Sequence, residues 1–145
     1  MSVVGRGLGI DSRREEATMP RSDRVAATVH VIDDDASVLR ALRRLLRAAG
    51  FIVETFTGTD EFVAATRSSP PHCLVLDIHL GILTGFDVHE QLVASGVSIP
   101  TIFITGYDEA ATRERAKNAG AAAYLPKPFE DQALISAIEG ALAGA

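Results

Sequence analysis

Short apolar runs alternate with amphipathic stretches from about residue 28 to the end of the chain. Five of these runs have the length of β-strands and are rich in β-branched, aromatic and leucine residues. The predicted strands are Thr28–Ile32, Phe51–Thr55, His72–Leu76, Thr101–Ile104 and Ala121–Leu125, the last being the weakest. Nearly continuous apolar runs of this kind are typical of parallel strands that are buried on both faces of a sheet.

The stretches between the runs predict five helices. In Ala36–Ala49 the apolar residues recur every three or four positions, and four arginines occupy the other face. The other predicted helices are Asp60–Arg67, Phe86–Ala94, Asp108–Ala119 and Glu130–Leu142. Strand and helix thus alternate five times, which predicts an α/β fold of the (βα)5 type: a doubly wound, five-stranded parallel sheet between two helical layers.

The first 25 residues differ from the rest of the chain. They show no sustained period, contain three glycines and a proline, and mix both charge signs, so we expect a flexible N-terminal arm over residues 1–25. A single domain then occupies residues 26–145, because 145 residues with 47% hydrophobic content suffice for one core but not for two. Met1 and Met19 both stay open as the true start.

Charge and cysteine content narrow the class of protein. Fourteen Lys and Arg against nineteen Asp and Glu give a net charge of −5, which argues against direct nucleic-acid binding. One cysteine, Cys73, cannot form an internal disulfide, and this favours a reducing compartment. The sequence has no apolar run of about 20 residues and no signal-peptide core, so we expect a cytoplasmic protein that does not bind membranes.

Polar residues follow four of the five predicted strands. In doubly wound sheets, ligands bind at the edge where the strands end, so these side chains are expected to converge there. They are Asp33, Asp34 and Asp35 after the first strand, Asp77 after the third, Thr105 after the fourth and Lys127 after the fifth. Neighbouring carboxylates repel one another, and either a raised pKa of one of them or a bound cation relieves that repulsion. Because the set offers only oxygen ligands, Mg²⁺ or Mn²⁺ suits it, and a carboxylate beside such a cation could accept a phosphoryl group.

The motifs around these residues carry a resemblance to a known family. They are VIDDD at the first strand, LVLDIHL around Asp77, FITG ending at Gly106, and YLPKPFED starting at Tyr124. In order and spacing they resemble a two-component response-regulator receiver domain with the flavodoxin-like, CheY-like architecture. The segments AGF at 49–51 and NAGA at 118–121 make the chain most similar to the FixJ-type subfamily, whose members often carry a DNA-binding domain; we expect none in this chain.

The resemblance implies an acceptor and a metal site. Asp77 would be the phospho-acceptor. Mg²⁺, or Mn²⁺ in its place, would be held by Asp34, Asp77 and the backbone carbonyl of His79, and by Asp33 through water.

The resemblance also implies a switch. Thr105 and Lys127 would contact the phosphoryl group, Tyr124 would be the aromatic switch residue that moves together with Thr105, and the Lys127–Pro128 peptide bond would be cis. Gly81 stands where the family usually has proline, so we expect a more mobile loop after the acceptor.

The expected function is therefore signalling rather than enzymatic catalysis. The domain would take a phosphoryl group from a histidine kinase or a histidine phosphotransfer protein, and at most phosphorylate itself from small donors and dephosphorylate slowly. It would pass the signal to a downstream protein or to an effector domain outside this chain, and the resemblance also allows a phosphorylation-dependent homodimer.

Two alternative functions stay open at this point. Asp33-x-Asp35 resembles the motif of haloacid-dehalogenase-type phosphatases, in which Asp33 would be the nucleophile. A receiver-like adaptor that signals without phosphorylation is the second alternative.

A further hypothesis concerns the lifetime of the phosphoryl group. We expect His79 and Tyr107 to flank the path of attacking water, with the Tyr107 ring shielding the acyl phosphate.

Overall fold

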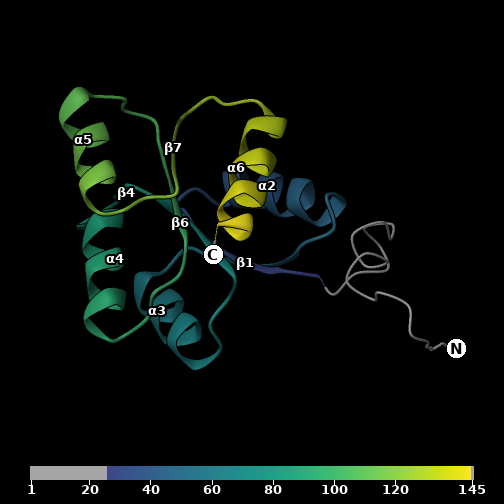
Figure 1. The fold of residues 1–145 in the computed structure, drawn as a ribbon, viewed down its shortest axis with the longest axis horizontal. Helices are drawn as coiled ribbons and strands as arrows, with labels where there is room; N and C mark the ends of the chain where they lie inside the picture. The colour runs from purple at the N-terminus through teal and green to yellow at the C-terminus, as the bar shows by residue number, and fades with distance from the viewer. Residues whose placement is uncertain (1–25, 145) are drawn as a thin grey trace, which may run out of the picture.

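The computed structural model describes residues 26–144 of the chain, and the arm predicted over residues 1–25 lies outside them. Figure 1 shows the arrangement of the helices and strands. In chain order they are β1 (Thr28–Ile32), α2 (Ala36–Ala48), β2 (Ile52–Phe56), α3 (Thr59–Ser68), β3 (Cys73–Asp77), β4 (His79–Leu80), β5 (Leu83–Thr84), α4 (Gly85–Ala94), β6 (Thr101–Thr105), α5 (Ala110–Asn118), β7 (Ala123–Pro126) and α6 (Asp131–Ala143). Within this part of the chain, none of the helices combines the length and apolar character that crossing a bilayer requires.

Five strands form one parallel sheet in the order β2-β1-β3-β6-β7, which confirms the predicted doubly wound α/β fold. The chain starts in β1, moves outward to β2, and then crosses back to build the sheet on the other side of β1. The direction of winding therefore changes between β1 and β3, where Val31 pairs with Val75. Ligands bind at such a point in this class of sheet, so a binding site is expected at the ends of β1 and β3.

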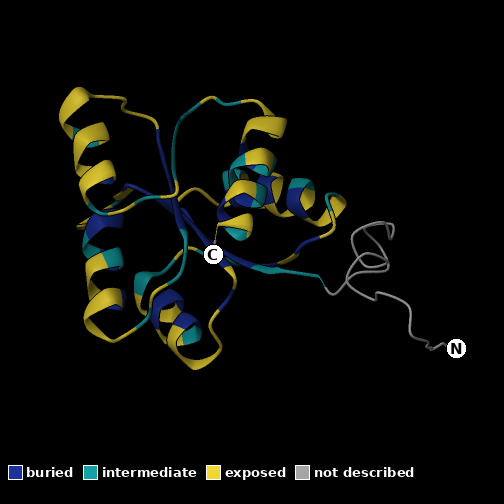
Figure 2. Ribbon diagram, viewed as in Figure 1, coloured by how far each residue is buried: buried dark blue, intermediate teal, exposed yellow. Residues whose placement is uncertain are grey.

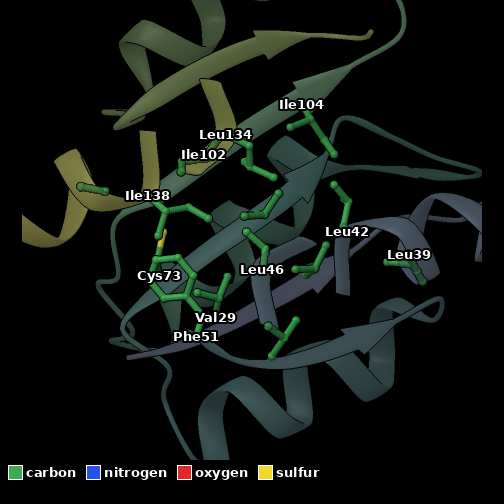
Figure 3. Packing of buried hydrophobic residues seen from close by; sticks show 14 residues of the cluster. Val29, Leu39, Leu42, Leu46, Phe51, Cys73, Ile102, Ile104, Leu134 and Ile138 are labelled. Atoms are coloured by element: carbon green, nitrogen blue, oxygen red, sulfur yellow. The ribbon is translucent and has the colours of Figure 1, made fainter. Parts of the chain in front are cut away.

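Helices cover both faces of the sheet (Figure 1). On one face, α2 and α6 pack against the strands; Figure 3 shows Leu42 and Leu46 of α2 together with Leu134 and Ile138 of α6 in this cluster. Cys73 lies in the same cluster as a free, buried thiol, as expected, and burial raises its pKa to about 12.

The other face carries α3, α4 and α5 and a second apolar cluster. Phe62 of α3 and Phe86 and Leu92 of α4 are buried in it. Of the residues in α5, Ala116 is the buried one, whereas α4 buries four of its residues. In Figure 2 the strands are mostly buried, and the outward faces of the helices are exposed. The helix α5 is therefore the one that the described core holds most lightly.

Every predicted strand and helix is present, with ends displaced by at most two residues. The segment after β3 differs from the sequence prediction, which placed a loop there. Leu80 pairs with Leu83 in a small antiparallel hairpin of β4 and β5, and Gly81 in its turn has a φ of 84°. Proline, which the family usually has at this position, is fixed near −65° and could not adopt that conformation. Two-residue strands are too short to produce a recognisable alternation, so the hairpin left no signal in the sequence pattern.

Candidate functional site

Three carboxylates meet at the edge of the sheet where β1 and β3 end. Asp33 and Asp34 directly follow β1, and Asp77 is the last residue of β3. Oxygens of the three side chains lie within 4.8 Å of one another. Asp33 is 0% exposed and Asp77 4% exposed, whereas Asp34 is exposed. Two of the acidic groups are thus buried, and the third lies at the surface beside them.

Lys127 approaches this cluster from the end of β7. Its Nζ lies 2.8 Å from Oδ2 of Asp33 and 3.5 Å from Oδ2 of Asp77. Its backbone N–H donates to the carbonyl of Thr105 at 2.7 Å, which ties the lysine to the end of β6. The Lys127–Pro128 bond is cis, which confirms that expectation. Burial disfavours the charged ammonium, but its hydrogen bond to Asp33 and the charges of both carboxylates outweigh burial and raise the pKa of Lys127.

The acidic cluster is only partly neutralised. Burial, followed by the charge of Asp33, raises the pKa of Asp77 to about 6, although Lys127 and the His79 N–H act in the opposite direction. One ammonium faces three carboxylates, so negative charge is left over in a largely buried place. Oxygen ligands with surplus negative charge suit a divalent cation such as Mg²⁺. The arrangement of these residues therefore fits the cation that the sequence predicts.

Asp35 has a different role from its two neighbours. Its side chain caps α2, with Oδ1 accepting from the backbone N–H of Ser37 at 2.9 Å and of Val38 at 3.3 Å. Hydrogen bonds from Ser37, side chain first, hold the pKa of Asp35 below its usual value. Its own backbone N–H donates to Oδ1 of Asp33 at 2.9 Å and so helps to orient that carboxylate. The Asp35 side chain therefore serves as the helix cap of α2 and not as a member of the carboxylate cluster.

Thr105 ends β6, beside β3, and is fully buried. Its hydroxyl accepts from the backbone N–H of Tyr107 at 3.0 Å and donates to the carbonyl of the same residue at 3.2 Å. In this structure the Thr105 hydroxyl is therefore hydrogen-bonded to the backbone of the loop that follows β6.

Two aromatic side chains meet beside Asp77. The backbone N–H of His79 donates to Oδ1 of Asp77 at 3.3 Å, and the His79 ring packs edge-to-face against Tyr107 with centroids 4.8 Å apart. Tyr107 itself is largely exposed.

Gly85 is a site residue that the sequence prediction missed. A Cβ at this position would lie 2.5 Å from the carbonyl oxygen of Asp77, so a larger side chain would displace the backbone of Asp77. Gly85 comes close to Asp77 because the hairpin folds back on the end of β3, where the backbone N–H of Gly85 donates to the carbonyl of Ile78 at 2.8 Å. Its only signal in the sequence is its place just before the α4 pattern.

Tyr124 lies on β7, three residues before Lys127, and its hydroxyl donates to Oδ1 of Asp108 at 3.1 Å. Asp108 also accepts from Arg113. Neither Asp108 nor Arg113 stands out in the sequence, because both are exposed charged residues in a region rich in them.

Comparison with known proteins adds sequence evidence to this geometry. Residues 29–139 match the family described as "Response regulator receiver domain". The response regulator protein TodT of Pseudomonas putida is 39% identical over 121 residues, which cover 83% of this chain and 53% of TodT. Nodulation protein W of Bradyrhizobium diazoefficiens is 39% identical over 115 residues, 79% of this chain and 51% of that protein. The chain thus spans about half the length of these curated relatives.

Solved structures agree with the sequence comparison. A response regulator receiver protein from Burkholderia phymatum is 43% identical, with a TM-score of 0.71, over 81% of this chain and 95% of that one. The FixJ-N structure is 31% identical, with a TM-score of 0.77, over 84% of this chain and 98% of that one.

Proposed function

The chain belongs to the response-regulator receiver family, and from this premise we propose that Asp77 accepts a phosphoryl group from a phosphohistidine. The donor would be a histidine kinase or a histidine phosphotransfer protein. The observation that carries the proposal is the cluster itself: Asp77 is a buried member of a group of three carboxylates, and the Nζ of Lys127 lies 3.5 Å from its Oδ2.

Transfer needs one bond to form and one to break. An oxygen of Asp77 attacks the phosphorus in line, the O–P bond forms, and the N–P bond of the phosphohistidine breaks. The imidazole nitrogen keeps the electron pair of the broken bond. An ionised carboxylate has no proton to lose, so the step requires no general base.

Asp34, Asp77 and the backbone carbonyl of His79 would hold Mg²⁺, with Asp33 acting through water; Mn²⁺ would fit the same ligands. When bound, the cation neutralises charge on the phosphoryl oxygens. The Lys127 ammonium supplies a second positive charge, and its contact with Asp33 at 2.8 Å keeps it in place before the phosphoryl group arrives.

Phosphorylation then changes the surface of the domain. The Thr105 hydroxyl would turn to a phosphoryl oxygen, and to do so it must leave the Tyr107 backbone groups that it contacts in the structure. Tyr124 would move inward with it, and the surface of α5, β7 and α6 would change for a downstream protein, an effector domain or a second copy. The output is a population shift between two surfaces and not a reaction on a substrate.

The alternatives account for less. A haloacid-dehalogenase-type phosphatase would use the Asp33-x-Asp35 pair, but the Asp35 side chain caps α2, and such a site would leave Asp77 without a role. A phosphorylation-independent adaptor would have no need of three converging carboxylates and a lysine.

Intact mass spectrometry tests the proposal. After incubation with acetyl phosphate and Mg²⁺, the chain should gain one phosphoryl group, and Asp77→Asn should gain none. Glu114→Gln removes an exposed carboxylate on α5 and serves as the matched control, which should be labelled like the original chain. A label that survives in Asp77→Asn but is lost in Asp33→Asn would support the phosphatase instead.

A further inference from the structure

A small polar cluster, which we call the clamp, holds the hydroxyl end of Tyr124. Asp108 accepts the Tyr124 O–H at Oδ1 (3.1 Å) and Nη2 of Arg113 at Oδ2 (2.6 Å), so both of its oxygens are used. The guanidinium of Arg113 also lies over the Tyr124 ring, 5.2 Å from its centroid. The side chains of Asp108 and Arg113 are 38% and 59% exposed, so the clamp keeps the tyrosine hydroxyl at the molecular surface.

The clamp is connected to the acceptor site through a short loop. Asp108 directly follows Tyr107, whose backbone N–H and carbonyl both bond the Thr105 hydroxyl. If Thr105 turns to a phosphoryl group, residues 106–108 lose the contacts that fix them to the end of β6. The loop that carries Asp108 is then free to move, and the acceptor of the Tyr124 hydrogen bond moves with it.

We propose that Asp108 and Arg113 are positioning residues that hold Tyr124 at the surface in the unphosphorylated protein and thereby oppose occupation of the Asp77 site. This inference rests on the proposed function and adds a restraint on the switch. Arg113 orients Asp108 and favours its ionised form: the hydrogen bond from Arg113 is the main reason that the pKa of Asp108 is lowered. The tyrosine hydroxyl therefore meets a charged acceptor, which binds it more strongly than a neutral one.

Linkage gives the clamp a measurable effect at a distance. If the clamped state binds a phosphoryl group less well than the released state, releasing the clamp must raise the affinity of the site for a phosphoryl group. The direction is the same whichever partner is removed, because both hold the same tyrosine. Simple charge effects behave differently: removal of Asp108 would favour an anion at the site, and removal of Arg113 would oppose it.

The experiment measures binding of beryllium fluoride, an analogue of the aspartyl phosphate, to the full chain in the presence of Mg²⁺. Amide signals near Asp77 followed by NMR give the half-saturating concentration. Asp108→Ala and Arg113→Ala should each tighten binding by about three- to tenfold, the range expected for an exposed charged hydrogen bond. The double variant should show no more than the larger single effect, because the two changes disrupt one unit.

Control variants separate the explanations. Glu109→Gln removes the same charge one residue away from Asp108 and should leave the affinity unchanged. Opposite effects of Asp108→Ala and Arg113→Ala, or no effect of either, would overturn the clamp. If the unmodified chain fails to bind beryllium fluoride, or if Asp77→Asn still binds it, the proposed function fails as well. Thermal unfolding of each variant should stay a single transition and fall by no more than a few degrees, the loss expected for one exposed ion pair, which shows that the shift in affinity does not come from general destabilisation.

Discussion

Substituting Asp77 with asparagine is expected to stabilise the metal-free protein against unfolding at neutral pH. Burial, reinforced by the charge of Asp33, raises the pKa of Asp77 from 3.8 to about 6 in the folded chain. The unfolded chain loses this proton at lower pH than the folded chain does. The free energy of unfolding therefore falls as the pH rises from about 4 to about 6, and it stays low above that range. Asparagine carries no charge and avoids this loss.

The size of the effect follows from the pKa. A rise of about two units corresponds to about 3 kcal/mol, at about 1.36 kcal/mol for each unit. Asparagine gives up the charge contact with Lys127, where 3.5 Å separates Nζ from Oδ2, but its amide oxygen can still accept the His79 N–H. We therefore expect a net gain of about 1–3 kcal/mol at about pH 7.5.

Urea unfolding in the presence of EDTA measures this gain. The original chain, Asp77→Asn and the control Glu114→Gln are compared at about pH 4.5 and pH 7.5. The gain from Asp77→Asn should appear mainly at the higher pH, and the control should show no such dependence. An Asp77→Asn protein that is no more stable than the original at pH 7.5, or equally stabilised at both pH values, would refute the reasoning.

Three other changes test the site. Adding Mg²⁺ to the metal-free chain should raise its free energy of unfolding by about 2.7 kcal/mol at a free concentration 100-fold above Kd; a urea titration that gives no increase would exclude a cation at the carboxylates. Tyr107→Ala should speed the loss of the phosphoryl group from Asp77 severalfold, because the ring that packs on His79 no longer blocks water; an unchanged rate would end the shielding hypothesis. Gly85→Ala should lower the free energy of unfolding by about 1–3 kcal/mol, because its Cβ would lie 2.5 Å from the Asp77 carbonyl oxygen; an unaltered urea midpoint would show that the loop yields freely.

The pattern of apolar and polar residues predicts the ends of a strand accurately where the strand is fully buried and less accurately where it is half-buried. The range of β1 is predicted without error, because its residues from Val29 to Ile32 are all buried and apolar or aromatic in character. The edge strand β7 is only half-buried along its length, so its predicted range starts two residues too early. The hairpin after β3 depends on the left-handed backbone of Gly81, and a single glycine does not specify which turn it makes.

The acidic site could be predicted because it depends on topology. Parallel strands end at one edge of the sheet, so Asp33, Asp77 and Lys127 converge whatever the details of packing. The clamp could not be predicted in this way. Asp108 lies in a loop and Arg113 on a helix, and their meeting with Tyr124 depends on the path of residues 106–109, which no period in the sequence records.

Because α5 buries little apolar surface, only a small free energy is needed to displace it from the core. Withdrawing Ala116 from the second core cluster would expose the surface of a methyl group, at a cost of about 1 kcal/mol, whereas displacing α4 would expose Phe86 and Leu92 at about 1.5–3 kcal/mol each. A shift of the loop before α5 can therefore carry that helix along while the sheet and the remaining helices keep their places. Of the described helices, α5 is therefore the one that apolar packing holds least firmly. It lies next to the residues that would respond to phosphorylation.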